Sequence, residues 1–177
     1  MEVIKPTTRL NELAKVSEPF DFSNPPFDPK EFAEALARKM IKENGIGLAA
    51  IQVGIPYRIF AIRTDPIFVC FNPRVVDVSG QEIIHEEGCL SFPGMTVKVK
   101  RFEEVRLRFQ NHDGKFITRK LAGLAARVAQ HESDHLDGVL FYNRATPYHR
   151  EQALRRWERA LKRKSAPQIN TLEREGA

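Results

Sequence analysis

The residues most suggestive of chemistry are His131-Glu132-Ser133-Asp134-His135. In a helix, residues four apart lie on one face, one turn from each other. His131 and His135 can therefore direct two imidazoles at one metal ion, and Glu132 beside the first ring can reach a water molecule on that ion. The same spacing also suits an amphipathic helix whose histidines bind nothing.

A hydrolytic metal site needs a third protein ligand and an open position for water. Cys89 offers a thiolate at the expected end of a strand, and the preceding Gly88 permits close backbone approach. The alternative is a buried structural thiol, which is the more common fate of an unpaired cysteine. Cys70 lies within the apolar run 67–71 and is expected to be such a core residue.

A third segment, residues 45–52, reads Gly-Ile-Gly-Leu-Ala-Ala-Ile-Gln. Its small residues allow tight packing beside a site, and the Gln52 amide can donate a hydrogen bond. The alternative is a helix end followed by a turn of small residues. The segment is not a phosphate-binding loop, because it has neither the Lys-Ser/Thr pair nor the third glycine of such loops.

Taken together, the three segments resemble the sequence blocks of the peptide deformylase family. That family carries Gly-x-Gly-x-Ala-Ala-x-Gln, Glu-Gly-Cys-Leu-Ser and Gln-His-Glu-x-Asp-His in this order, and the blocks stand here at 45–52, 87–91 and 130–135. The similarity extends over residues 3–145. It implies a hydrolase that removes the formyl group from formyl-methionyl nascent polypeptides and releases formate.

The resemblance also implies the roles of individual residues. One divalent metal would be held by Cys89, His131 and His135. Family members typically use Fe²⁺, and Zn²⁺, Ni²⁺ or Co²⁺ can occupy the site. Glu132 would take a proton from the attacking water and pass it to the leaving amine. The backbone N–H of Leu90 and the side-chain amide of Gln52 would stabilise the oxyanion.

A narrow apolar pocket for the methionine side chain is expected beside the metal. The resemblance implies that it is lined by Gly45, Ile46, Gly47, Glu87, Gly88, Leu124, Val128 and the aliphatic stem of Arg127. Leu124 and Val128 also have helical spacing, so packing in the core is an equal alternative for both. Thr96 departs from the family, because some members have an arginine there that contacts the substrate backbone.

Supporting residues are expected around the metal ligands. Glu87 would pair with Arg101 and brace the Cys89 loop, as similar residues do in the family. The alternative is an ordinary surface ion pair, worth at most about 1 kcal/mol. Gln130 and Asp134 would orient the histidines. The remaining histidines, His85, His112 and His149, are expected not to bind metal.

Two other functions fit the histidine pair. A general zinc metalloprotease uses the same pattern, but the chain has no long substrate-cleft region and a cysteine ligand would be unusual there. A non-catalytic member that only binds peptide or ribosome would need a broken site. Cys89, Glu132 and Gln52 are all present, which favours an enzyme.

Composition sets the broad class. The chain has 177 residues, 42% hydrophobic, and its formal net charge is +5. Such a chain can fold without disulfides, and its two cysteines exclude a disulfide-rich scaffold and favour a reducing compartment. No signal sequence, transit sequence or membrane-length apolar run is visible, so we expect a cytoplasmic protein with no membrane contact.

The patterning predicts an α+β fold, with antiparallel strands around a central metal-site helix and with N-terminal and C-terminal helices. Residues 1–165 are expected to form a single catalytic domain, followed by a polar tail at 166–177. Asp28 should cap a first helix that Gly45 ends in the left-handed conformation. Strands are expected at 58–62, 67–72, 74–78, 81–86, 104–110 and 115–120, and the metal-site helix at 123–136.

A last helix is expected at 148–164, and it is strongly basic. Its cations are Arg150, Arg155, Arg156, Arg159, Lys162, Arg163 and Lys164, against only Glu151 and Glu158. One interpretation is a surface that docks on ribosomal phosphates, as a similar helix does in bacterial relatives. The other is an ordinary solvated helix face.

Overall fold

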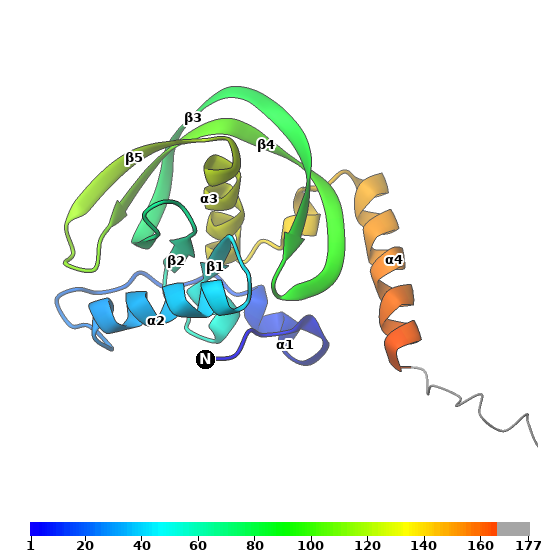
Figure 1. Ribbon diagram of the computed structural model, residues 1–177, viewed down its shortest axis with the longest axis horizontal. Coiled ribbons are helices and arrows are strands. Elements are labelled where there is room, and N and C mark those ends of the chain that lie inside the picture. Colours follow the sequence, from blue (N-terminus) through cyan, green and yellow to red (C-terminus); the bar gives the residue numbers. More distant parts are fainter. Residues whose placement is uncertain (166–177) are drawn as a thin grey trace, which may run out of the picture.

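One antiparallel sheet curls around helix α3, and the other helices lie outside it (Figure 1). This arrangement comes from a computed structural model that describes residues 1–165. The helices are α1 (Pro6–Leu13), α2 (Pro29–Lys42), α3 (Gly123–Leu136) and α4 (Pro147–Ser165), with the short 3-10 helices η1 (Ala50–Val53) and η2 (Phe141–Arg144). The strands are β1 (Gly47–Ala49), β2 (Ile59–Ile62), β3 (Phe68–Cys89), β4 (Phe92–Gln110) and β5 (Phe116–Ala122). The expected α+β class is confirmed.

Helix α2 begins and ends close to the expected residues. The Asp28 side chain accepts a hydrogen bond from the Glu31 N–H, which caps the first turn. Leu36 and Met40 are fully buried along one face. The left-handed residue at its end is Asn44, with φ of +55°, so the assignment of this conformation to Gly45 is wrong. Asparagine tolerates that region because its short side chain hydrogen-bonds locally.

Strand β3 replaces three shorter strands of the sequence prediction. Its pairing with β4 shifts register between Phe71 and Arg74 and again between Ser79 and Glu82. These shifts coincide with Pro73 and Gly80, the residues that suggested strand ends. Proline cannot donate to the ladder and glycine permits a bulge, so both interrupt the register without ending the strand.

Helix α3 packs its small residues against the concave face of the sheet. Ala126, Ala129 and Leu136 share one buried cluster with Val105 and Leu107 of β4. The helix ends at Leu136, and Gly138 two residues beyond it has a φ of +70°. Cys70 is fully buried in the same cluster, which confirms its core role.

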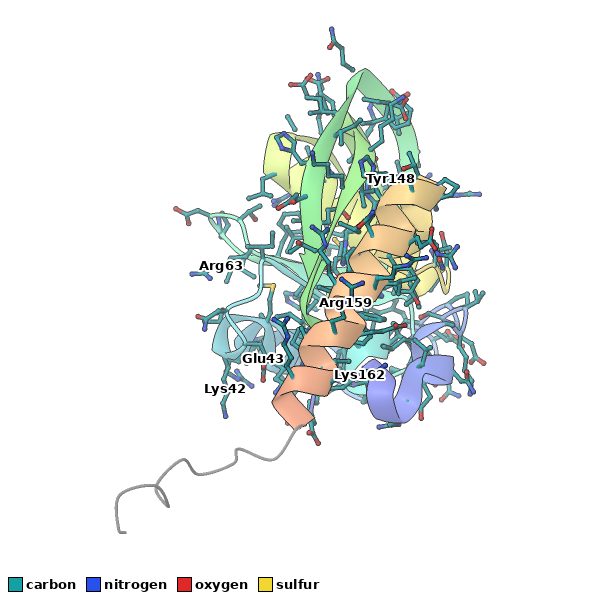
Figure 2. All side chains as sticks on the ribbon, turned by 90° about the vertical axis from the view of Figure 1, so that its right-hand side faces the viewer. Lys42, Glu43, Arg63, Tyr148, Arg159 and Lys162 are labelled. Atoms are coloured by element: carbon teal, nitrogen blue, oxygen red, sulfur yellow. The ribbon has the colours of Figure 1, made fainter. Side chains whose placement is uncertain are left out.

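Helix α4 lies beside the start of β4, on the right of Figure 1. The Trp157 indole N–H donates to the Pro93 carbonyl at 3.0 Å, and its ring centroid lies 5.7 Å from that of Phe92. Figure 2 shows Arg159 and Lys162 projecting from this helix. The expected polar tail, 166–177, lies outside the described residues. None of the helices in residues 1–165 has the length and apolar character needed to cross a membrane.

Substitution Gly138→Ala should destabilise the fold more than Gly94→Ala. Both glycines have positive φ, +70° and +78°. A Cβ at Gly138 would lie 2.6 Å from the Ala14 carbonyl oxygen, whereas one at Gly94 meets nothing within 4 Å. We expect backbone strain of about 1 kcal/mol in both, with a further loss only at Gly138. Urea unfolding measures the difference, and equal losses would contradict a tight contact there.

Candidate active site

The thiol of Cys89 and the imidazoles of His131 and His135 converge on one point. Cys89 is the last residue of β3, and the histidines lie one turn apart on the buried face of α3. Their ligand atoms lie within 4.8 Å of one another, with 3.3 Å between Cys89 Sγ and His135 Nε2. The structure thus brings together the three residues that the sequence nominated as metal ligands.

The two histidines present the same ring nitrogen to this point. Nδ1 of His131 lies 3.0 Å from a Glu87 carboxylate oxygen, which leaves Nε2 for the site. Burial lowers the pKa of His131, but hydrogen bonds with Cys89 and Glu87 raise it to about 10. Burial and the His131 charge hold the pKa of His135 well below its usual range. Binding of a metal ion to the metal-free protein would therefore displace a proton from His131.

Glu132 is a buried carboxylate beside the three ligand residues. Its side chain is 3% exposed, and Oε2 has no hydrogen-bond partner among the described residues. Burial raises the pKa of Glu132 to about 7. An unsatisfied buried oxygen beside one cysteine sulfur and two imidazoles fits a metal site with a water molecule in reach of the carboxylate.

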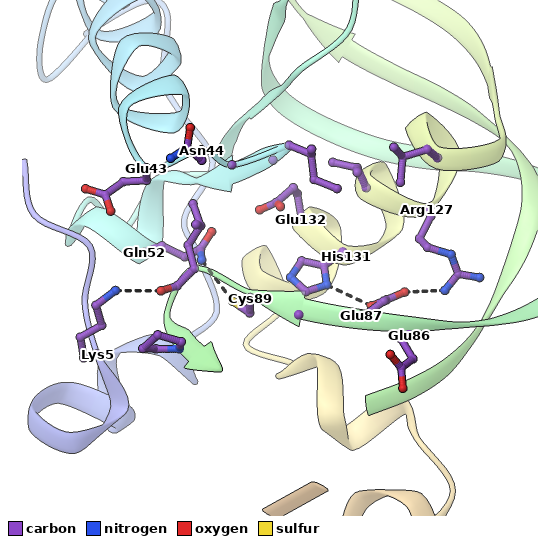
Figure 3. Close-up of a pocket in the computed structure, with 18 residues that line it drawn as sticks. Lys5, Glu43, Asn44, Gln52, Glu86, Glu87, Cys89, Arg127, His131 and Glu132 are labelled. Atoms are coloured by element: carbon purple, nitrogen blue, oxygen red, sulfur yellow. Dashed lines mark hydrogen bonds and ion pairs between the residues drawn. The ribbon is translucent and has the colours of Figure 1, made fainter. Parts of the chain in front are cut away.

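Gln52 approaches the site from the opposite side to His131 (Figure 3). Its Oε1 accepts the Ala49 N–H at 2.8 Å, which fixes the orientation of the amide. Its Nε2 then donates to Cys89 Sγ at 3.4 Å and to Ser91 Oγ at 3.1 Å. Sequence reasoning did not single out Ser91, although it stands in the same motif as Cys89.

Leu90 follows Cys89 at the turn between β3 and β4. Its carbonyl accepts a hydrogen bond from Lys5 Nζ at 2.8 Å. Its side chain packs against Gly45, where an added Cβ would come within 2.8 Å of Leu90 Cδ1. The N-terminal segment and the glycine-rich segment thereby hold this turn against the site.

Glu87 accepts hydrogen bonds from two guanidinium groups as well as contacting His131. Arg101 donates twice, at 3.0 Å each, and Arg127 once, at 2.7 Å. The Arg101 and Glu87 side chains are each 5% exposed, so the alternative of a surface ion pair is wrong. Burial alone would raise the pKa of Glu87, but the His131 and Arg101 hydrogen bonds lower it to about 2.

Gln130 and Asp134 do not contact the histidines in the expected way. The Gln130 side chain bonds the backbone N–H and carbonyl of Phe102 on β4. Asp134 binds Arg101 and Arg144. Both residues therefore attach α3 to neighbouring segments, and among the described residues neither bonds a histidine ring itself. Glu87 occupies that position for His131.

A cavity of about 600 Å³ opens beside the three ligand residues. All eight expected pocket residues line it: Gly45, Ile46, Gly47, Glu87, Gly88, Leu124, Arg127 and Val128. Leu124 is 62% exposed, which excludes core packing, whereas Val128 belongs to both the cavity wall and the core. Sequence reasoning missed the further lining residues Lys5, Glu43, Asn44, Glu86 and Pro93, although Asn44 and Glu86 adjoin the motifs.

Comparison with known proteins agrees with this geometry. The family model described as polypeptide deformylase matches residues 5–151. The chain belongs to the polypeptide deformylase family. The peptide deformylase of Thermodesulfovibrio yellowstonii is 42% identical over 130 residues, covering 70% of this chain and 78% of the relative. That of Novosphingobium aromaticivorans is 33% identical over 189 residues, covering 91% and 97%.

Solved structures of the family have the same fold. The Thermus thermophilus peptide deformylase matches with a TM-score of 0.78 and 34% identity, covering 86% of this chain and 90% of that one. A Met-Ala-Ser-bound peptide deformylase from Acinetobacter baumannii matches with a TM-score of 0.74 and 30% identity, covering 81% and 97%. The family removes N-formyl groups from nascent peptides and is metal-dependent, so this chain is a hydrolase of protein biosynthesis.

Stability of the metal-free protein should fall as the pH drops from about 4.5 to about 2. Glu87 has its pKa lowered from 4.5 to about 2 in the fold, so the unfolded chain takes up the proton first. The contribution is fully present above pH 4.5 and amounts to about 3 kcal/mol. Substitution Glu87→Gln should flatten the slope in this range, as measured by urea unfolding at each pH.

The neighbouring variant Glu86→Gln is the matched control, because Glu86 is exposed. It should keep the slope of the unmodified protein. If Glu87→Gln kept that slope as well, Glu87 would not be the carboxylate that couples stability to pH.

Proposed function

We propose that Cys89, His131 and His135 hold one divalent metal ion with which the protein hydrolyses the formyl amide of formyl-methionyl peptides. The observation that carries the proposal is the convergence of these ligand atoms at a cavity that Cys89 and His131 line, beside the unsatisfied Oε2 of Glu132.

The identity of the metal is proposed from the resemblance. Fe²⁺ is our choice, with Zn²⁺, Ni²⁺ or Co²⁺ able to occupy a site of one thiolate and two imidazoles. Such an ion supplies Lewis acidity, which polarises a carbonyl oxygen and lowers the pKa of water from about 16 to about 7. With Fe²⁺ and a thiolate ligand, the site would be sensitive to oxygen.

Glu132 would move the proton. With a pKa of about 7, its carboxyl group gains and loses a proton close to neutral pH. It would accept a proton from water as the water oxygen attacks the formyl carbon. It would then deliver that proton to the amine nitrogen as the carbon–nitrogen bond breaks, leaving formate and a free methionyl amine.

Two donors would stabilise the oxyanion that forms on the formyl oxygen. Gln52 Nε2 already points at the Cys89 sulfur, and its amide is held by the Ala49 N–H. The Leu90 N–H belongs to the turn that Lys5 and Gly45 hold in place. One such donor is worth about 3 kcal/mol in the transition state.

The substrate chain would lie between two open strand edges. Within the described residues, β1 pairs only with β2, and residues 82–89 of β3 pair only with β4. The cavity separates these edges, so an extended peptide can hydrogen-bond to both. Ile46, Leu124, Val128 and the Arg127 stem would take the methionine side chain. The Acinetobacter baumannii relative has been solved with Met-Ala-Ser bound, which supports a peptide as the ligand of this chain.

Substitution Glu132→Ala should abolish formate release from formyl-Met-Ala-Ser while the metal stays bound. The side chain is not among the proposed ligands, so metal content should match that of the unmodified protein. We would measure formate release and metal content on anaerobically purified protein, with Glu82→Ala as a surface control on β3. An unmodified enzyme that cleaved an internal peptide bond in preference to the formyl amide would contradict the proposal and favour a protease.

The proposal extends to the cellular setting. Residues 1–165 would work as a single catalytic domain in the cytoplasm, where nascent formyl-methionyl chains emerge from ribosomes. Helix α4 would dock on the ribosome through its basic face. Arg156, Arg159 and Arg163 surround Ala160 on one face that bears no acidic residue, and they line a shallow hollow of about 470 Å³. The Trp157–Pro93 hydrogen bond joins this helix to the cavity wall.

Reversing Arg156, Arg159 and Arg163 to glutamate should abolish pelleting with ribosomes and leave formate release unchanged. The matched control reverses Arg74, Arg106 and Arg108, exposed cations on the sheet, and makes the same change in net charge. Pelleting is measured at rising salt, because phosphate contacts weaken as salt increases. Equal loss in both triple variants would indicate only a general charge effect and contradict docking through α4.

A further inference from the structure

A chain of ion pairs runs from η2 to the proposed metal ligand His131, and its outer end is Arg144. The Arg144 guanidinium donates to Asp134 through Nη2 at 2.6 Å and through Nε at 3.1 Å to each carboxylate oxygen. Sequence reasoning gave Arg144 no role, because η2 carries no motif and lies between two helices.

Asp134 also binds Arg101. Nη1 of Arg101 donates to Asp134 Oδ2 at 2.5 Å, while its Nε and Nη2 donate to Glu87. The same guanidinium is therefore divided between two buried carboxylates. Glu87 in turn lies 3.0 Å from Nδ1 of His131.

Because Glu87, Arg101 and Asp134 are all buried, the way in which Arg101 is shared between the two carboxylates affects both of them. The side chains of Glu87, Arg101 and Asp134 are 5%, 5% and 7% exposed, whereas that of Arg144 is 49% exposed. A buried carboxylate must keep a cation partner, because an uncompensated buried charge is very costly. If Arg144 is removed, Asp134 retains only Arg101 among the cations that bind it here.

We propose that Arg144 is a positioning residue for the metal centre. By satisfying one side of Asp134, it leaves Arg101 free to hold Glu87 in the orientation that sets the His131 ring. Without it, Asp134 draws Arg101 toward itself, and the Glu87–His131 contact loosens. Hydrogen bonds of this outer kind fix ring orientation and raise ligand basicity, and their loss typically costs 10–100-fold in metal affinity or activity.

The chain offers a closely matched control in Arg58. Its Nη1 binds Asp137 at 2.8 Å and the Leu136 carbonyl at 3.3 Å, at the end of the same helix α3. No hydrogen bond or ion pair of the described residues links Arg58 to Glu87. Arg58→Gln therefore removes an arginine–aspartate pair at the end of α3 and leaves the contacts among Asp134, Arg101, Glu87 and His131 intact.

The experiment compares Co²⁺-loaded unmodified protein with the variants Arg144→Gln, Arg144→Lys and Arg58→Gln. It measures the rate of Co²⁺ release to a chelator, the visible absorption of the bound Co²⁺, and urea unfolding of the metal-free proteins. We expect release about 10-fold faster in Arg144→Gln with a shifted spectrum, an intermediate rate in Arg144→Lys, and a change under about 2-fold in Arg58→Gln. Lysine retains the charge but loses the paired geometry of the guanidinium.

Equal release rates in Arg144→Gln and Arg58→Gln would overturn the inference. So would a loss of stability in Arg144→Gln with an unchanged spectrum and release rate, because Arg144 would then be purely structural. If Arg144→Gln does not fold, Arg144→Lys against Arg58→Gln decides in the same way. The inference rests on the proposed metal site, and unmodified protein that binds no Co²⁺ would overturn that site instead.

Discussion

The structure around the site depends on one constraint, which is that the buried Glu87 carboxylate must keep its charged partners. Those partners come from β4 through Arg101 and from α3 through Arg127 and His131, while Glu87 itself belongs to β3. Breaking one such contact leaves a charge in a nearly dry environment, at a cost of several kcal/mol. The two longest strands and the central helix therefore have to meet at this carboxylate. The interaction that brings the chain together here is the same one that directs a proposed metal ligand.

The repeat of side-chain direction along β3 and the different repeat along α3 determine where the Cys89 sulfur and the two histidine rings lie. Along a strand, residues two apart share a face, so fixing Glu87 toward α3 also turns Cys89 toward α3. Along a helix, residues three and four apart share a face, so His131, Asp134 and His135 all point toward the sheet. The thiol and the imidazoles meet where these two faces cross. Their convergence follows from this packing of β3 against α3.

This logic explains how much the sequence could predict. Regular spacing was enough for the α3 and α2 boundaries and for the candidate ligands, because period and motif are local properties. The cavity lining came instead from the resemblance to the peptide deformylase family. Spacing could not assign partners to Gln130 and Asp134, since both face inward and the choice among nearby groups depends on the tertiary structure. The length of β3 was missed for a related reason: Pro73 and Gly80 are local signals for a break, and pairing with β4 on both sides of each bulge overrides them. Lys5 and Arg144 lie on segments without a motif, so only the fold reveals their contacts.

The glycine-rich segment packs against Glu132, the proposed proton carrier. A Cβ on Gly47 would lie 2.3 Å from Glu132 Oε1 and 2.6 Å from Val128 Cγ1, so only glycine allows β1 to approach the helix this closely. That approach helps exclude water from the Glu132 carboxylate, and this burial raises its pKa to about 7. A larger residue would push β1 away, rehydrate the carboxylate and return its pKa toward that of an ordinary glutamate. Glutamate with an ordinary pKa remains a base at neutral pH but rarely carries the proton that the leaving amine requires. The close packing that requires glycine at position 47 thus also sets the pKa on which the proposed proton transfer depends.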